Sequence, residues 1–152
     1  MRVETTRFGG IEVDQQLVIE MPAGMLGLER CKRFALLEGQ GDSAFKWLQS
    51  LDDPALAFIV INPMDFFADY EVALTDEQTE ALDLSDPADA VLLTTVTVCR
   101  EQEQVSANLA GPIVVNAQTL RARQIVLEDE RYSTRHVICD SLAPCPAVSG
   151  RK

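Results

Sequence analysis

The stretch from Ser106 to Asp129 constrains the fold most, because its residues have the pattern of a β-hairpin. Ile113 to Val115 form one short β-branched run and Gln124 to Leu127 form a second. The polar residues between them, Asn116 to Arg123, are suited to the connecting turn. Pro112 marks where the first strand begins, since proline has no N–H for a ladder and is tolerated at a strand's first residue. The stretch predicts the structural centre of a mainly β domain and contains no catalytic motif.

Other β-rich runs predict further strands at Arg2 to Phe8, Ile11 to Val13, Leu17 to Glu20, Phe34 to Glu38, Phe45 to Leu51, Ala57 to Ile61 and Ala90 to Cys99. The last two are predicted to be central, because the first is continuously apolar and the second is the longest. Ala90 to Cys99 is expected to pair with the hairpin stretch, which follows it after the polar link Arg100 to Gln104.

One short helix is predicted from Thr75 to about Leu82. The Thr75 hydroxyl can accept from the backbone N–H of Gln78, and the Gln78 side chain can reach back, which is a capping box. Asp76 and Glu77 also suit the positive end of the helix dipole.

Pro22 to Gly27 predicts a loop, with two glycines available for positive φ. Its apolar residues Met25 and Leu26, together with Leu28, are either core anchors or a contact surface. The core is favoured, since a loop must attach to the domain somewhere.

The length of 152 residues predicts one domain over residues 1–140, followed by a disordered tail over residues 141–152 that is rich in Ala, Pro and Ser. No apolar run approaches the roughly 20 residues that cross a bilayer. The polar start of the chain lacks the apolar core of a secretory signal. We therefore expect a cytoplasmic protein without membrane contact.

The formal net charge of -11 disfavours direct nucleic-acid binding and favours partners with a basic surface. The four cysteines form no C-x-x-C pair, and a single histidine is available to complete a metal site. We expect no metal and no cofactor, with reduced thiols and Cys99 in the core.

His136 is the only candidate for a general base near neutral pH, and Ser133, Thr134 and Asp140 lie close to it in sequence. Catalytic triads are instead assembled from distant segments with the nucleophile on a strained turn, and no G-x-S-x-G motif is present. A surface or packing histidine is favoured, and the protein is predicted not to be an enzyme.

An acid and aromatic loop, Phe66, Phe67, Asp69, Tyr70 and Glu71, is more informative. Either it places both phenylalanines in the core and its acids in solvent, or it forms an interface in which tyrosine is an anchor within a charged rim. The first reading is favoured for the phenylalanines.

With these residues in view, the chain resembles the flagellar assembly factor FliW family over roughly Val3 to His136. The matching motifs are Phe8-Gly9, Pro22-Ala23-Gly24, Gly27-Leu28-Glu29, Arg33-Phe34, Trp47-Leu48-Gln49-Ser50, Asp53-Pro54, Ala57-Phe58, Asn62-Pro63, Phe66-Phe67, Asp69-Tyr70-Glu71, Ala107-Asn108-Leu109, Gly111 to Asn116 and Gln124 to Leu127. Their order and spacing together are specific. The departures from the family pattern are mild exchanges at Leu26, Leu28, Met64, Ala68 and Gly111.

The resemblance implies a small antiparallel β-barrel-like domain with one or two short helices. It further implies a non-enzymatic regulator that binds the translational regulator CsrA, relieves repression of flagellin mRNA, and also binds flagellin. The alternative is a flagellin chaperone without a translational role. We expect a monomer when the protein is alone. The predicted partner-binding residues are Phe66, Phe67, Asp69, Tyr70, Glu71, Asn108, Leu109 and Asn116, although Asn108 and Asn116 are favoured for turn geometry.

Overall fold

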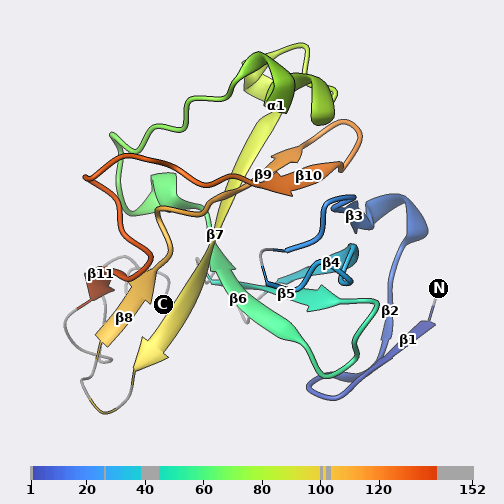
Figure 1. Cartoon of the computed structure of the whole chain (residues 1–152). Coiled ribbons are helices and arrows are strands. Elements are labelled where there is room, and N and C mark those ends of the chain that lie inside the picture. The colour runs from blue at the N-terminus through green and yellow to red at the C-terminus, as the bar shows by residue number, and fades with distance from the viewer. Residues whose placement is uncertain (1, 26, 39–44, 100, 102–103, 140–152) are drawn as a thin grey trace.

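The fold is mainly antiparallel β structure with one short α-helix, as predicted, in a computed structural model that describes residues 2–25, 27–38, 45–99, 101 and 104–139 (Figure 1). The strands are β1 (Arg2–Thr5), β2 (Gly9–Glu12), β3 (Ile19–Glu20), β4 (Arg33–Glu38), β5 (Lys46–Ser50), β6 (Ala57–Ile61), β7 (Ala90–Cys99), β8 (Gln104–Ala107), β9 (Ile113–Asn116), β10 (Ala122–Gln124) and β11 (His136–Cys139). The helix is α1 (Asp76–Ala81), and three 3₁₀ turns are η1 (Gln15–Leu17), η2 (Pro63–Asp65) and η3 (Pro87–Asp89). Within the described residues, no helix has the length and apolarity that crossing a bilayer requires.

The larger sheet follows the order β10-β9-β7-β6-β5-β4-β3, with β8 and β11 attached beside β7. The two ends of this path meet. The Glu20 N–H donates to the Leu120 carbonyl at 2.9 Å, and Glu20 and Arg121 form an isolated parallel bridge. The sheet therefore curls in the barrel-like manner predicted, with a single bridge and not a full ladder at the seam.

Strand β7 is the axis of this sheet, and it has the predicted bounds. Its first residues pair with β9, its middle with β6 and its end with β8. The prediction that this strand pairs with the hairpin stretch is confirmed. Strand β6 also has its predicted bounds and lies between β5 and β7.

The predicted hairpin is present as β9 and β10, but its second strand is wrong in position. The structure places it at Ala122–Gln124, and the predicted residues after Gln124 only continue alongside Pro112 and Ala110. The Ile125 N–H donates to the Pro112 carbonyl at 2.8 Å, and the Leu127 N–H donates to the Ala110 carbonyl at 2.8 Å. Because Pro112 has no N–H to return, the regular ladder ends before it.

Three local predictions need correction near the N-terminus. The first strand ends at Thr5 and not at Phe8, because the Thr5 hydroxyl accepts from the Phe8 N–H and donates to the Gly9 carbonyl, closing a turn. The second strand accordingly begins at Gly9, earlier than predicted. Leu17 lies in η1 and not in a strand, because the Asp14 carboxylate accepts from the Gln16 N–H and starts a 3₁₀ turn.

The loop after Pro22 is anchored in the core, which is the alternative that the sequence favoured over a contact surface. The Met25 side chain is buried and Leu28 is half-buried against the same cluster, which contains Phe34 and the free thiol of Cys31. Leu26, the side chain of Cys99 and the predicted tail at 141–152 lie outside the described residues.

The capping box of α1 is confirmed. The Thr75 hydroxyl accepts from the Gln78 N–H at 3.1 Å, and the Gln78 side chain accepts from the Thr75 N–H at 2.9 Å. Two strands were not predicted, β8 and β11, which pair with each other. Each is four residues long, too short for its own periodicity to be distinctive.

Candidate protein-interaction surface

The acid and aromatic loop follows η2 and packs its rings inward. Phe66 stacks on Phe45 with ring centroids 6.2 Å apart, and Phe67 meets the His136 ring edge-on at 5.0 Å. Both phenylalanines are half-buried against the cluster around Ile61. The structure therefore packs both side chains against the core but does not bury them fully, which agrees only in part with the favoured prediction that they lie in the core.

Tyr70 is the buried member of the loop, at 3% exposure, between the exposed carboxylates of Asp69 and Glu71. Its hydroxyl donates to the Leu109 carbonyl at 2.6 Å, and its ring meets Tyr132 edge-on at 4.7 Å. Burial raises the pKa of Tyr70 well above its ordinary value, and Tyr132 adds to this effect. The hydroxyl therefore remains a donor throughout the neutral range.

The backbone after Tyr70 is held by the same aromatic pair. The Glu71 N–H donates to the Tyr132 hydroxyl at 3.2 Å, and Arg131 lies over the Tyr132 ring, 5.1 Å from its centroid. The aromatic pair holds the backbone at Tyr70 and Glu71, and the carboxylates of Asp69 and Glu71 are exposed to solvent beside it. Such a surface can bind a cationic partner, and among its described residues no nucleophile is paired with an oriented base.

The three other predicted site residues lie in the interior or at its edge. Leu109 is fully buried, and its N–H donates to the Ser133 carbonyl at 3.0 Å. Asn108 is half-buried, and its Oδ1 accepts no hydrogen bond from the described residues.

Asn116 is 2% exposed and joins two segments. Its Nδ2 donates to the Leu82 and Asp83 carbonyls at 2.9 and 3.0 Å, and its Oδ1 accepts from the backbone N–H of Gln118 at 2.8 Å. The favoured role in turn geometry is thus visible for Asn116. The structure brings Tyr70 and Leu109 into contact with each other, whereas Asn116 belongs to the helix side of the fold.

His136 lies on β11, half-buried against Phe67. Asp140, the carboxylate that lies close to His136 in the sequence, is outside the described residues. Among the described side chains, no group of three or more His, Cys, Asp or Glu residues is arranged to hold a metal ion.

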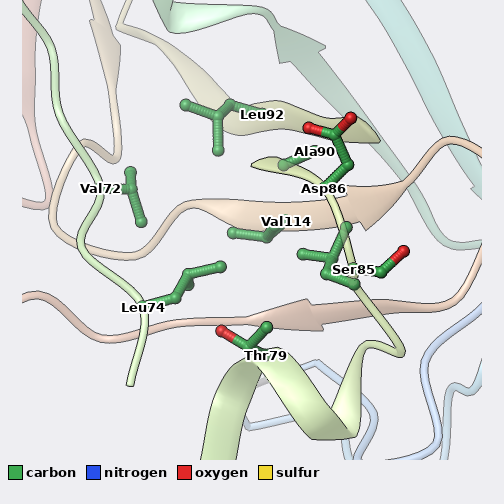
Figure 2. Close-up of a pocket in the computed structure, with 9 residues that line it drawn as sticks. Val72, Leu74, Thr79, Ser85, Asp86, Ala90, Leu92 and Val114 are labelled. Carbon is green, nitrogen blue, oxygen red and sulfur yellow. The ribbon is translucent and has the colours of Figure 1, made fainter. Parts of the chain in front are cut away.

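One feature of this surface escaped the sequence predictions: a pocket of about 530 Å³ beside α1, which we call the α1 pocket. It is lined by Val72, Leu74, Thr79, Leu84, Ser85, Asp86, Ala90, Leu92 and Val114 (Figure 2). These residues come from five segments, so no local motif could reveal them.

A charge signal in the sequence does point to this region. Residues 47–99 contain 11 of the 24 acidic residues and none of the 13 Lys and Arg residues. The remainder of the chain is formally balanced, so the whole net charge of -11 arises in this segment. The segment includes the acid and aromatic loop, α1 and most of the lining of the α1 pocket.

Comparisons with known proteins agree on one family. The family model "FliW protein" matches residues 2–138. The flagellar assembly factor FliW of Geobacter sulfurreducens is 43% identical over 99% of this chain and 94% of its own length. That of Geotalea uraniireducens is 46% identical over 90% of this chain and 83% of its own length.

A solved crystal structure of the flagellar assembly factor FliW superimposes with a TM-score of 0.82 at 32% identity, covering 90% of this chain and 96% of that one. The family match spans nearly all described strands, including the stretch around β9 and β10 from which the resemblance was first argued. This chain belongs to the FliW family.

Proposed function

We propose that the protein is a non-enzymatic partner switch that couples flagellin synthesis to flagellum assembly. It binds the translational regulator CsrA, which relieves repression of flagellin mRNA, and it also binds flagellin, so that accumulated flagellin releases CsrA. The observation that carries the proposal is membership, over residues 2–138, of a family whose relatives are named for flagellar assembly. The segregated negative charge supports it, because an acidic surface suits an RNA-binding regulator with basic patches.

The contact surface in this proposal is the acid and aromatic loop. Asp69 and Glu71 present the carboxylates, and the half-buried rings of Phe66 and Phe67 supply apolar area below them. Tyr70 and Leu109 hold the backbone that presents this surface through their hydrogen bond, whereas Asn116 braces the end of the helix segment. Asn108 completes the predicted set at the start of the link between β8 and β9.

The direct test is calorimetric titration of the purified protein into CsrA and, separately, into flagellin. We expect both partners to bind, and flagellin to displace CsrA from a preformed complex. The rival function, a flagellin chaperone without a translational role, predicts flagellin binding alone. Absence of CsrA binding at low salt would remove the switch and leave the chaperone.

The contact surface is tested by the double variant Asp69→Asn and Glu71→Gln, with Asp65→Asn and Glu130→Gln as a control of equal charge. All four side chains are exposed, so neither variant disturbs the core. We expect the first pair to weaken CsrA binding by about tenfold and the control by much less. Equal weakening by both pairs would show that only net charge matters, and not this loop.

Two further parts of the proposal have separate tests. A His136→Ala variant should leave both binding curves unchanged, and any loss of a hydrolytic activity in that variant would argue for an enzyme. We also propose that the protein alone is a cytoplasmic monomer, which sedimentation equilibrium and cell fractionation check.

A further inference from the structure

The α1 pocket is a second surface, and no residue of the acid and aromatic loop is among its lining residues (Figure 2). Its volume of about 530 Å³ lies within the range of about 300 to 1,000 Å³ that is common for ligand sites. Leu92 and Ala90 reach it from β7, Val114 from β9, and Val72 and Leu74 from the segment after the loop. Six of its nine lining side chains are apolar, so it would favour an apolar occupant.

The pocket stays unfilled for a reason that the helix sequence explains. Helix α1 reads DEQTEA, contains no large apolar residue and has no buried residue. It borders the pocket through Thr79, while Leu82, just after the helix, is the side chain that packs on Val114 and Ile125. The helix therefore forms one side of the pocket, and none of its side chains fills it.

The segments that border the pocket at α1 and at the link to β7 are acidic, whereas Arg123 of β10 pairs with Val114 of the lining. Asp76, Glu77 and Glu80 lie on α1, and Asp83, Asp86 and Asp89 follow on the link to β7. Within the part of the chain that the structure describes, none of these six forms an ion pair. Clustered unpaired carboxylates repel one another, and a cationic partner would relieve that repulsion.

This charge decides which occupant fits the apolar pocket. Nucleic acid and anionic lipid surfaces are repelled by the six carboxylates, and so is a second copy of this acidic chain. A protein segment with an apolar face and flanking Lys or Arg residues satisfies both the lining and the rim. Amphipathic helices dock into apolar grooves in this way.

We propose that the α1 pocket docks a cationic amphipathic segment of a partner protein, placing its apolar side chains over Leu92 and Val114 and its basic side chains beside Asp76, Asp83 and Asp86. The site is separate from the loop surface proposed above and does not depend on which partners that surface binds. It gives the protein a second docking position, contiguous in sequence with the first through Val72.

The test uses a synthetic helical peptide of about 18 residues, with Leu at i, i+3, i+4 and i+7 positions and Lys elsewhere. Fluorescence anisotropy with the full chain measures its Kd in about 10 mM salt, where the Debye length is about 30 Å. Two matched peptides serve as controls: one with Glu in place of Lys, and one with Ser in place of Leu. We expect binding of the Lys and Leu peptide and at least tenfold weaker binding of both controls.

The protein variant neutralises three rim carboxylates together: Asp76→Asn, Asp83→Asn and Asp86→Asn. Asparagine at position 83 suits the positive φ of 55° that Asp83 adopts. The control variant Glu20→Gln, Glu29→Gln and Glu130→Gln has the same net charge, and it changes exposed acids outside the rim. We expect about fivefold weaker peptide binding in the rim variant and a smaller change in the control.

Amide chemical shifts locate the peptide independently of any variant. Shifts at Leu74, Thr79, Ser85 and Ala90 would support the proposal, whereas shifts confined to Asp69 and Glu71 would overturn it. Equal binding of the Glu and Lys peptides, or equal effects of the two protein variants, would also overturn it. The proposal would also be overturned if sedimentation showed that the protein alone is a dimer and the amides at the α1 pocket shifted on dimerisation. Because the assay contains neither CsrA nor flagellin, its failure leaves the proposed function standing.

Discussion

The Tyr70 hydroxyl donates a hydrogen bond of 2.6 Å to the carbonyl oxygen of Leu109, 39 residues away in the sequence. Both side chains are buried in one apolar cluster. This contact joins the acid and aromatic loop to the link between β8 and β9. The position of the exposed carboxylates of Asp69 and Glu71 therefore depends on a buried polar contact.

Removing that hydroxyl by Tyr70→Phe should lower the free energy of unfolding by about 1 to 2 kcal/mol, because the buried Leu109 carbonyl loses its donor. Urea unfolding monitored by circular dichroism measures this change. Tyr132→Phe is the matched control, since its hydroxyl accepts only from the exposed Glu71 N–H in the described structure. A larger loss in the control would contradict the role given to Tyr70.

Asn116→Ala should lower the free energy of unfolding by about 3 kcal/mol, because it leaves the Leu82 and Asp83 carbonyls and the Gln118 N–H without their partner. Asn62→Ala removes a cap on the Met64 N–H at a less buried site, and about 1 kcal/mol is expected there. Thermal unfolding of both variants compares them. Similar melting temperatures for the two would show that Asn116 does not brace the helix end.

The Asp52 carboxylate connects the turn after β5 to the start of β4. It accepts from the backbone N–H groups of Lys32 and Arg33 at 2.7 and 2.9 Å, and the Arg33 guanidinium lies 3.6 Å away. Partial burial alone would raise the pKa of Asp52, but these three groups outweigh it and hold the pKa below its usual value.

A carboxylate with a lowered folded-state pKa stabilises the fold above its unfolded-state pKa of about 3.9, and the effect is lost as pH falls through the folded-state pKa. Asp52→Ala should therefore cost about 1 to 2 kcal/mol at pH 7 and progressively less below about pH 4. Urea titrations across this pH range measure the difference. If the loss in free energy of unfolding did not change with pH, the effect of Asp52→Ala would come from lost packing and not from the lost charge.

Gly24 and Gly27 both have positive φ, of 72° and 82°, but only Gly24 is crowded. A Cβ at Gly24 would lie 2.5 Å from the Glu29 carbonyl oxygen, whereas a Cβ at Gly27 would meet nothing within 4 Å. Gly24→Ala should destabilise by about 3 kcal/mol or more, and Gly27→Ala by about 1 kcal/mol. The melting temperatures and expression yields of the two variants measure this difference. A lower melting temperature for Gly27→Ala than for Gly24→Ala would contradict the account.

If electrostatics steer the encounter with CsrA, the association rate should fall clearly between about 10 mM and 0.15 M salt. Stopped-flow fluorescence measures it. Because the net charge arises in residues 47–99, neutralising three acids there should reduce this salt dependence more than neutralising three elsewhere. A flat response in the unmodified protein would remove the steering argument.

Much of the fold could be predicted where one segment carries its own signal. The bounds of β6 and β7 follow from continuous apolar or β-branched runs, and the capping box of α1 is complete within four residues. The order of short motifs from Phe8 to Leu127 also identified the family that the comparisons show. The predictions were wrong where the bounds of an element depend on the strand it pairs with. The second hairpin strand is an example, because its ladder stops at Pro112.

The sequence by itself determined the strand-rich class, the helix start and the concentration of negative charge between residues 47 and 99, because these depend on residue types close together in the chain. Only the tertiary structure decided that Asn116 braces the end of the helix segment, that Tyr70 bonds Leu109, and that five segments enclose the α1 pocket. These relationships arise when the sheet curls and brings distant residues together. Their free energy comes from burial and hydrogen bonding across the fold, which no local pattern encodes.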